Sequence, residues 1–177
     1  MTAPVSYEAI TLPGTSASAV GAPPPVSAAL RKVPHHAFIV DPAAADTAAF
    51  LDRYRWPARA AANTIIVVAK SGETATYAVC VALATTRLDV NKVVKKVLDA
   101  RRVSFAPMDY AVSATGMEHG SITPFGTPPD WPILVDPRVL EAGAVVIGGG
   151  RRQLKVVVDG RSLAAIPHAL AIAGLAV

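Results

Sequence analysis

The chain has 177 residues, of which 52% are hydrophobic, and a formal net charge of +4 at pH 7. This length is typical of one domain with a packed core, and no stretch approaches the roughly 18 uninterrupted apolar residues of a membrane span. The amino terminus lacks a basic segment followed by an apolar one, so we expect no secretory signal. The single cysteine, Cys80, lies in an apolar run, which fits a core thiol in the reducing cytoplasm, where we expect the protein.

Two parts are expected along the chain. Residues 1–25 are rich in Ala, Pro, Ser and Gly, and they bury too little apolar surface to offset the entropy of ordering. This composition predicts a flexible or loosely attached extension. Residues 26–177 are expected to form a single domain.

The first half of the domain is predicted to mix helices with a hairpin. In chain order we expect a helix at 26–32, a strand at 37–40, a helix from Pro42 to about Tyr54, and strands at 64–68 and 76–83. Asp41 is a good N-cap for the helix that Pro42 opens. The turn residues Ser71-Gly72-Glu73 join the last two strands into a β-hairpin.

A helix capped by Asp89 is predicted to be amphipathic. Its apolar residues recur at helical spacing, at Val90, Val93, Val94, Val97 and Leu98. Lys92, Lys95 and Lys96 lie toward the opposite face, which is either a solvated surface or a set of phosphate contacts. Nucleic acid becomes a reasonable partner if this basic group, with Arg101 and Arg102, meets the second one at Arg151, Arg152 and Lys155.

The remaining elements are short. They are a strand at 103–106, a helix from Pro107 to about Thr115, strands at 133–135, 144–147 and 154–158, a helical turn at 137–140, and a last helix capped by Ser162. Gly116 is the expected C-cap of the helix that Pro107 opens. Because strands and helices alternate without a regular βαβ rhythm, the sequence favours an α+β sheet or barrel over a doubly wound fold.

The most unusual segment runs from Thr115 to Gly126. It holds three glycines, one proline and three hydroxyl residues in twelve positions. Glycine permits a positive φ, and Pro124 restricts the residue before it to extended geometry, so this segment is neither a helix nor a central strand. It is either an ordinary surface connection or a shaped loop whose amides bind a carbonyl or phosphate oxygen.

No metal or nucleotide motif is present, and no cofactor is expected. His35, His36, His119 and His168 do not form an H-x-x-x-H pair, although His119 is an acid/base candidate within the loop. Gly148-Gly149-Gly150 lacks the spacing of a phosphate-binding loop. A second glycine-lined wall of the same pocket is an equally simple interpretation.

Four short motifs in order resemble the family of YbaK and prolyl-tRNA-synthetase-associated editing domains. The family loop T-G-x-x-x-G-G/S-[IV]-[ST]-P-x-G is matched by residues 115–126. The others are an L-A-T stretch before a lysine-bearing helix, an aspartate after an apolar strand, and a G-G-[KR]-R-x-L segment. They are matched by Leu83-Ala84-Thr85 with Lys92, by Asp136, and by Gly149 to Leu154.

This resemblance, which covers about residues 33–167, implies a mixed, curled barrel-like sheet surrounded by helices. It also implies hydrolysis of wrongly charged aminoacyl-tRNA, with loop amides holding the ester carbonyl and the tRNA terminus assisting water attack. The catalytic residues it implies are Gly120, Ser121 and Asn63. The substrate-binding residues it implies are Thr64, Lys92, Gly116, Thr123, Pro124, Gly126, Asp136, Gly149 and Gly150.

The chain departs from the family pattern at one position. The family has K-T-[LI]-[LIV]-V, whereas this sequence has Asn63-Thr64-Ile65-Ile66-Val67. Asparagine can orient a hydroxyl but brings no positive charge, and charge-assisted contacts are roughly twice as strong as neutral ones. Two hypotheses follow: a trans-acting aminoacyl-tRNA deacylase that binds the tRNA 3′ end, or a binding module with the family pocket and weak or no chemistry. A pocket repurposed for a small amino-acid-like ligand is a third. The oligomeric state and the amino acid removed stay open.

Overall fold

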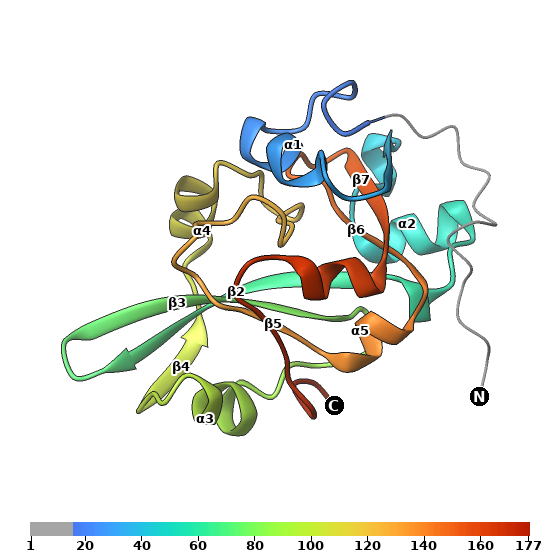
Figure 1. Cartoon of the computed structure of the whole chain (residues 1–177). Helices are drawn as coiled ribbons and strands as arrows, with labels where there is room; N and C mark the ends of the chain where they lie inside the picture. The colour runs from blue at the N-terminus through green and yellow to red at the C-terminus, as the bar shows by residue number, and fades with distance from the viewer. Residues whose placement is uncertain (1–15) are drawn as a thin grey trace.

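The computed structural model describes residues 16–177, which fold around two β-sheets (Figure 1). The smaller sheet has the order β1-β7-β6, and all its pairs are antiparallel. Its strands are β1 (His35–Ile39), β6 (Ala144–Gly148) and β7 (Leu154–Asp159). The larger sheet has the order β4-β2-β3-β5-β8. Its strands are β2 (Ala62–Ser71), β3 (Thr74–Leu83), β4 (Arg102–Phe105), β5 (Ile133–Val135) and β8 (Ala169–Ala171).

The two sheets meet at the start of β2, where Ala61 forms a parallel bridge with Val146 of β6. In the larger sheet the β3–β5 and β5–β8 pairs are parallel, and the other pairs are antiparallel. The predicted α+β class is therefore confirmed. The strands form two joined sheets and do not close into a barrel.

Short helices surround the sheets. They are α1 (Pro24–Leu30), η1 (Pro42–Ala44), α2 (Thr47–Tyr54), η2 (Ala58–Ala60), η3 (Val90–Val94), α3 (Lys95–Val97), α4 (Met108–Thr115), α5 (Pro137–Glu141) and η4 (Gly160–Ala165). Figure 1 shows α4 and α1 above the larger sheet and α3 below it. The segment from Lys92 to Lys96 thus lies on the other side of this sheet from α1, α2 and β7, so the two basic groups of the sequence do not meet.

The helix predicted from Pro42 to Tyr54 is broken in the structure. The Asp41 side chain accepts a hydrogen bond from the Ala43 amide and caps only the 3-10 turn η1. The chain then becomes extended at Asp46, where φ is −73° and ψ is 149°, and α2 begins at the next residue. This break exposes the Ala45 carbonyl to a side chain of β7, as described below.

Other boundaries follow the sequence pattern closely. The hairpin, α4 with its Gly116 C-cap at φ 66°, and strands β5 to β7 appear where they are predicted. The helix after Asp89 starts as a π-helical turn, and the last helix is capped by Asp159, not by Ser162. Strand β8 is not predicted from the sequence.

The core lies between the sheets and beneath α4 and α1. Cys80 is fully buried in a second cluster on the opposite face of the larger sheet, with Val94 of η3 and Leu134 of β5, and burial raises the pKa of its thiol to about 12, in line with a core thiol. Residues 1–15, the larger part of the predicted extension, lie outside the described residues. Ala17 and Ala22 are buried in the core cluster, and the Ala17 amide donates to His35 Nε2 over 2.9 Å. The packed chain thus begins before residue 26.

Candidate functional site

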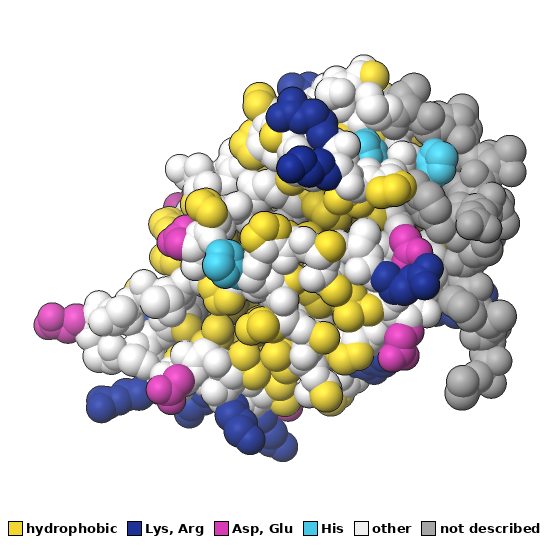
Figure 2. Space-filling model, in the orientation of Figure 1, with side chains coloured by type: hydrophobic (Ala, Val, Ile, Leu, Met, Phe, Trp, Pro, Cys, Tyr) yellow, Lys and Arg dark blue, Asp and Glu magenta, His cyan; other side chains and the backbone are white. Residues whose placement is uncertain are grey.

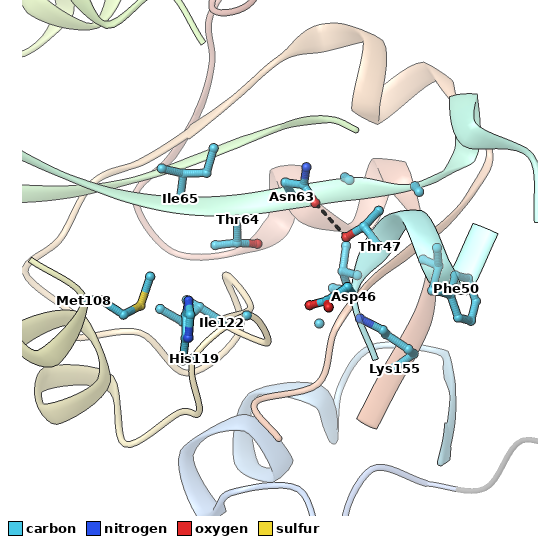
Figure 3. A pocket seen from close by; sticks show the side chains of 16 residues that line it. Asp46, Thr47, Phe50, Asn63, Thr64, Ile65, Met108, His119, Ile122 and Lys155 are labelled. Carbon is cyan, nitrogen blue, oxygen red and sulfur yellow. Dashed lines mark hydrogen bonds between the residues drawn. The ribbon is translucent and has the colours of Figure 1, made fainter. Parts of the chain in front are cut away.

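A cavity of about 270 Å³ opens where the two sheets meet (Figure 3). One wall is the glycine loop, which we define as residues 115–126, together with the start of α4 and the end of β6. The opposite wall is formed by the start of α2, the start of β2 and one side chain of β7. The lining residues are Asp46, Thr47, Phe50, Ala61, Ala62, Asn63, Thr64, Ile65, Met108, His119, Gly120, Ile122, Val146, Ile147, Gly148 and Lys155.

The glycine loop is fixed to the end of β6 by main-chain hydrogen bonds. The Gly150 amide donates to the Ser121 carbonyl over 2.8 Å, and the Glu118 amide donates to the Gly150 carbonyl over 2.9 Å. A Cβ at Gly148 would lie 2.6 Å from the Ser121 carbonyl oxygen, so only glycine allows this approach. Gly148 and Gly120 both line the cavity, on the same wall.

Two successive amides of the loop are available to a ligand. The N–H groups of His119 and Gly120 donate to no acceptor within residues 16–177. Gly120 has φ 74°, and adjacent N–H groups around such a residue suit an anionic or carbonyl oxygen. The loop can therefore offer neutral hydrogen-bond donors to the cavity, next to the exposed His119 side chain.

Polar groups of β2 and α2 face the loop across the cavity. The Thr47 hydroxyl donates to Asn63 Oδ1 over 3.2 Å. The Thr64 side chain points into the cavity, away from Ile65 (Figure 3), and its buried hydroxyl has no partner within the described chain. A buried hydroxyl without a partner is costly, so a ligand or water at this position would stabilise it.

The cavity also contains a buried cation, Lys155 of β7, whose side chain is 4% exposed. Its ammonium donates to the Ala45 carbonyl over 2.7 Å, which the break before α2 makes accessible. Burial lowers the pKa of Lys155, the Asp46 carboxylate opposes this shift, and the Arg152 guanidinium adds to it. Asp46 itself forms a salt bridge with Arg152 over 3.0 Å. A positive charge thus lies at the start of α2, the helix whose first residue also contacts Asn63.

Of the residues implied by the resemblance, three line the cavity: Gly120, Asn63 and Thr64. Ser121 does not, because its buried hydroxyl donates to the carbonyls of Arg151 and Leu154. Thr123 and Pro124 are buried residues of the loop that do not line the cavity, and Gly116 is the C-cap of α4. These positions shape the loop without contacting the cavity.

The remaining positions also have structural contacts. A Cβ at Gly126 would lie 2.6 Å from the Pro25 carbonyl carbon, and one at Gly149 would meet Leu154. Gly150 holds the loop through Ser121 and Glu118. Lys92 is exposed on η3, beyond the larger sheet.

Asp136 does not reach the cavity either. Its side chain caps α5, pairs with Arg138 over 2.7 Å and accepts from the Ala176 amide. Burial raises the pKa of this carboxyl, but the hydrogen bonds from Arg138 and Ala176 outweigh burial and lower it. This carboxylate therefore anchors the carboxyl-terminal segment.

The sequence analysis names Lys155 only as part of a basic group, and it places neither this lysine nor the start of α2 at the cavity. A signal for Lys155 exists, because lysine interrupts the apolar run Leu154-Lys155-Val156-Val157-Val158 in a strand buried on both faces. Lysine is almost never fully buried without a partner, so such a position points to a special environment. Nothing comparable marks Asp46 or Thr47, which follow an alanine-rich segment.

Within residues 16–177 no three or more His, Cys, Asp or Glu side chains gather in a way that could hold a metal ion. No helix in that range has both the length and the apolar character needed to cross a membrane.

Comparisons with known proteins agree with this fold. The chain is similar to the crystal structure of hypothetical protein APE2540, with TM-score 0.73 and 22% identity over 83% of this chain and 94% of that one. It is also similar to a structure described as a candidate trans-editing enzyme for prolyl tRNA synthetase, with TM-score 0.70 and 15% identity over 92% and 98% of the chains. The sequence model of the aminoacyl-tRNA editing domain matches residues 41–166, well over half of the chain. The protein therefore belongs to the aminoacyl-tRNA editing domain family.

Proposed function

We propose that the protein hydrolyses the ester bond of mischarged aminoacyl-tRNA, acting in trans. The observation that carries this proposal is the cavity itself, which is lined by two loop residues with unpaired amides within residues 16–177, by the buried ammonium of Lys155 and by two polar side chains of β2. Family membership and the structural likeness to a candidate trans-editing enzyme for prolyl tRNA synthetase support the same class of reaction. The cation needed opposite the loop would come from Lys155, in place of the lysine that Asn63 replaces.

The residues that line the cavity would have different roles in this reaction. The amides of His119 and Gly120 would hold the ester carbonyl and the negative charge that develops on its oxygen. The Lys155 ammonium has three donors, of which Ala45 uses one, so two remain for the oxygens of the substrate. Asn63 and Thr64 would orient the hydroxyls of the terminal ribose.

No serine or cysteine lines the cavity in the described part of the chain, so a covalent acyl-enzyme is not the favoured route. Water would add to the carbonyl carbon while a neighbouring ribose hydroxyl accepts its proton and passes its own proton on to the ester oxygen. The ester C–O bond then breaks, and the ribose oxygen leaves with a proton. The products are a free amino acid and a deacylated tRNA.

The direct test is deacylation of a panel of mischarged tRNAs by the wild-type protein and by Gly120→Val. This variant places a branched side chain in the cavity wall at φ 74° and should abolish turnover. Gly174→Val is the matched control, because it imposes the same backbone strain at φ 71° where a Cβ meets nothing within 4 Å. Wild-type turnover no faster than the Gly120→Val background across the panel would exclude a deacylase.

A second candidate is a binding module that keeps the pocket without the chemistry. The hydrogen bond from Thr47 favours it, because it occupies the oxygen of Asn63 where the family has a lysine. This candidate expects binding of a non-hydrolysable aminoacyl-adenosine analogue without turnover, and gain of hydrolysis in Asn63→Lys. Robust wild-type turnover would exclude it.

A further inference from the structure

One face of the larger sheet continues from the cavity toward the tip of the hairpin. Side chains alternate along a strand, so Thr64, Ile66, Val68 and Lys70 share a face of β2. Thr64 points into the cavity, and Ile66 packs in the same core cluster as Ile122 of the glycine loop. Val68 lies four residues beyond Thr64, about 13 Å along the strand, and Lys70 lies about 20 Å beyond it.

The neighbouring strands place aromatic and basic side chains on this face. Tyr77 of β3 is the cross-strand partner of Val68. Arg102 of β4 is the partner of Lys70 on the other side. Two cations thus lie one step further out than Tyr77 on the same face. Neither Lys70 nor Arg102 forms a salt bridge with another described residue.

Three rings stack over this part of the sheet. The centroids of Tyr77 and Tyr110 are 4.2 Å apart at an interplanar angle of 18°, and those of Tyr77 and Trp131 are 5.4 Å apart at 24°. Tyr110 is 39% exposed and offers the accessible ring surface, whereas Tyr77 is half-buried and Trp131 is 5% exposed, so these two rings support the stack. A surface hollow beside the rings is lined by Ala75, Thr76, Tyr77, Tyr110, Asp130, Trp131 and Pro132.

Helix α4 carries one residue of the cavity and one ring of the stack. Met108 lines the cavity and is 45% exposed, and Tyr110 follows two residues later on the same helix. Figure 2 shows hydrophobic side chains across the middle of this view, with Lys and Arg side chains gathered below them over β4 and α3. A ligand that extends from the cavity over α4 would meet the exposed ring of Tyr110, with Lys70 and Arg102 further out on the same face of the sheet as Tyr77.

We infer that this aromatic strip, formed by Tyr77, Tyr110 and Trp131 with Lys70 and Arg102, binds the unpaired nucleotides that precede the terminal nucleotide of an RNA 3′ end. The inference rests on the proposed function in placing that terminal nucleotide in the cavity. Bases stack on exposed aromatic rings whatever their sequence, and cations beside them contact the phosphates.

The charges define the path of the RNA backbone. Asp130 lies at the end of the hollow next to Trp131 and Glu73 lies in the hairpin turn, and both repel phosphate. The backbone therefore runs on the side of Lys70 and Arg102, with bases toward Tyr110. A peptide would gain little from this combination, because the exposed ring surface is flat and the adjacent charge is positive.

The test measures binding of an uncharged, fluorescently labelled single-stranded RNA ending in CCA, by anisotropy at several salt concentrations. Tyr110→Ala should weaken binding about tenfold or more, and Tyr110→Phe, which keeps the ring, should bind like the wild type. The double variant Lys70→Glu/Arg102→Glu should weaken binding and reduce the salt slope by about two. Arg31→Glu, a charge reversal at the exposed end of α1, is the matched control and should change little.

The experiment tests RNA binding by the strip separately from deacylation, because binding of an uncharged RNA requires no turnover. Absence of RNA binding by the wild type, or equal binding by all the variants, would overturn the strip. Equal binding of a blunt RNA duplex would overturn it as well. A small aminoacyl ester too short to reach Tyr110 should be hydrolysed equally by the wild type and Tyr110→Ala. If the wild type does not hydrolyse that ester but the variants change RNA binding as expected, the RNA-binding strip is supported and the proposed hydrolysis is contradicted.

Discussion

The two walls of the cavity are built in opposite ways. The glycine loop is one contiguous segment, and its shape follows from glycines at positive φ and from a proline within twelve residues. The opposite wall brings together Asp46, Asn63 and Lys155, which are far apart in the sequence. The first wall is encoded locally, whereas the second exists only because β7 and α2 pack against the start of β2.

The walls also differ in charge. The loop offers amides and one imidazole, and the buried hydroxyls of Thr115 and Ser121 donate to the Ala111 and Arg151 carbonyls, which lie outside the loop. The opposite wall holds an ammonium, a carboxylate and, through Asp46, the guanidinium of Arg152. In the proposed reaction the neutral wall would hold the ester carbonyl and the charge that develops on its oxygen, and the charged wall would contact other oxygens of the substrate. The predictions below separate these two roles.

The largest expected effect is the loss of the buried cation. Lys155→Met keeps the length of the side chain and removes its charge, so kcat/KM for deacylation should fall roughly ten- to a hundred-fold. Lys92→Met is the matched control, because Lys92 is exposed beyond the larger sheet. The measurement is the rate of loss of labelled amino acid from mischarged tRNA at limiting substrate.

If Lys92→Met lost activity by this factor and Lys155→Met kept the wild-type rate, Lys92 would be the substrate-binding lysine, as the resemblance implies. That result would also contradict the division between a neutral and a charged wall. Recovery of part of the lost activity in Lys155→Met/Asn63→Lys would show that the cation can act from either position.

The sequence predicts most of the fold because its signals are local. The hairpin, the C-cap at Gly116 and the caps at Asp41 and Asp89 depend on turn residues and side chains within a few positions. The break between η1 and α2 could not be predicted, since it depends on a lysine of β7 more than a hundred residues away. The short strand β8 depends on pairing with β5 and has little pattern of its own.

The site is predicted less completely for the same reason. The loop and the start of β2 are recognisable, and Gly120, Asn63 and Thr64 do line the cavity. Sequence cannot tell a glycine that faces a ligand from one that faces another backbone, as at Gly126 and Gly149. Nor can it tell which hydroxyl is already occupied, as at Ser121.

A smaller effect tests Ser121, which the resemblance places among the catalytic residues. Its hydroxyl donates to carbonyls of the segment after β6, so Ser121→Ala should lower the free energy of unfolding by about 1.5 kcal/mol. Its kcat/KM should stay within about twofold of the wild type, because the side chain does not line the cavity. Urea unfolding and deacylation rates measure the two quantities, with the exposed Ser113→Ala as control. If Ser121→Ala deacylates much more slowly than the wild type but is equally stable, Ser121 has a catalytic role.

The smallest effect is a gain in stability in the variant that loses most activity. Burial disfavours the charged form of Lys155, so Lys155→Met should raise the free energy of unfolding by about 1 kcal/mol near neutral pH. The gain should shrink as pH rises from the lowered pKa of the folded state toward the ordinary value of 10.5. In that window the unfolded chain binds a proton that the folded wild type has released, so the wild type becomes more stable as pH rises.

Lys155→Met has no such group, so its free energy of unfolding and that of the wild type should converge, which urea unfolding across this pH range would measure. If Lys155→Met is less stable than the wild type at every pH, the hydrogen bond to the Ala45 carbonyl stabilises the fold by more than burial of the charge destabilises it. Lys155 would then have a structural role.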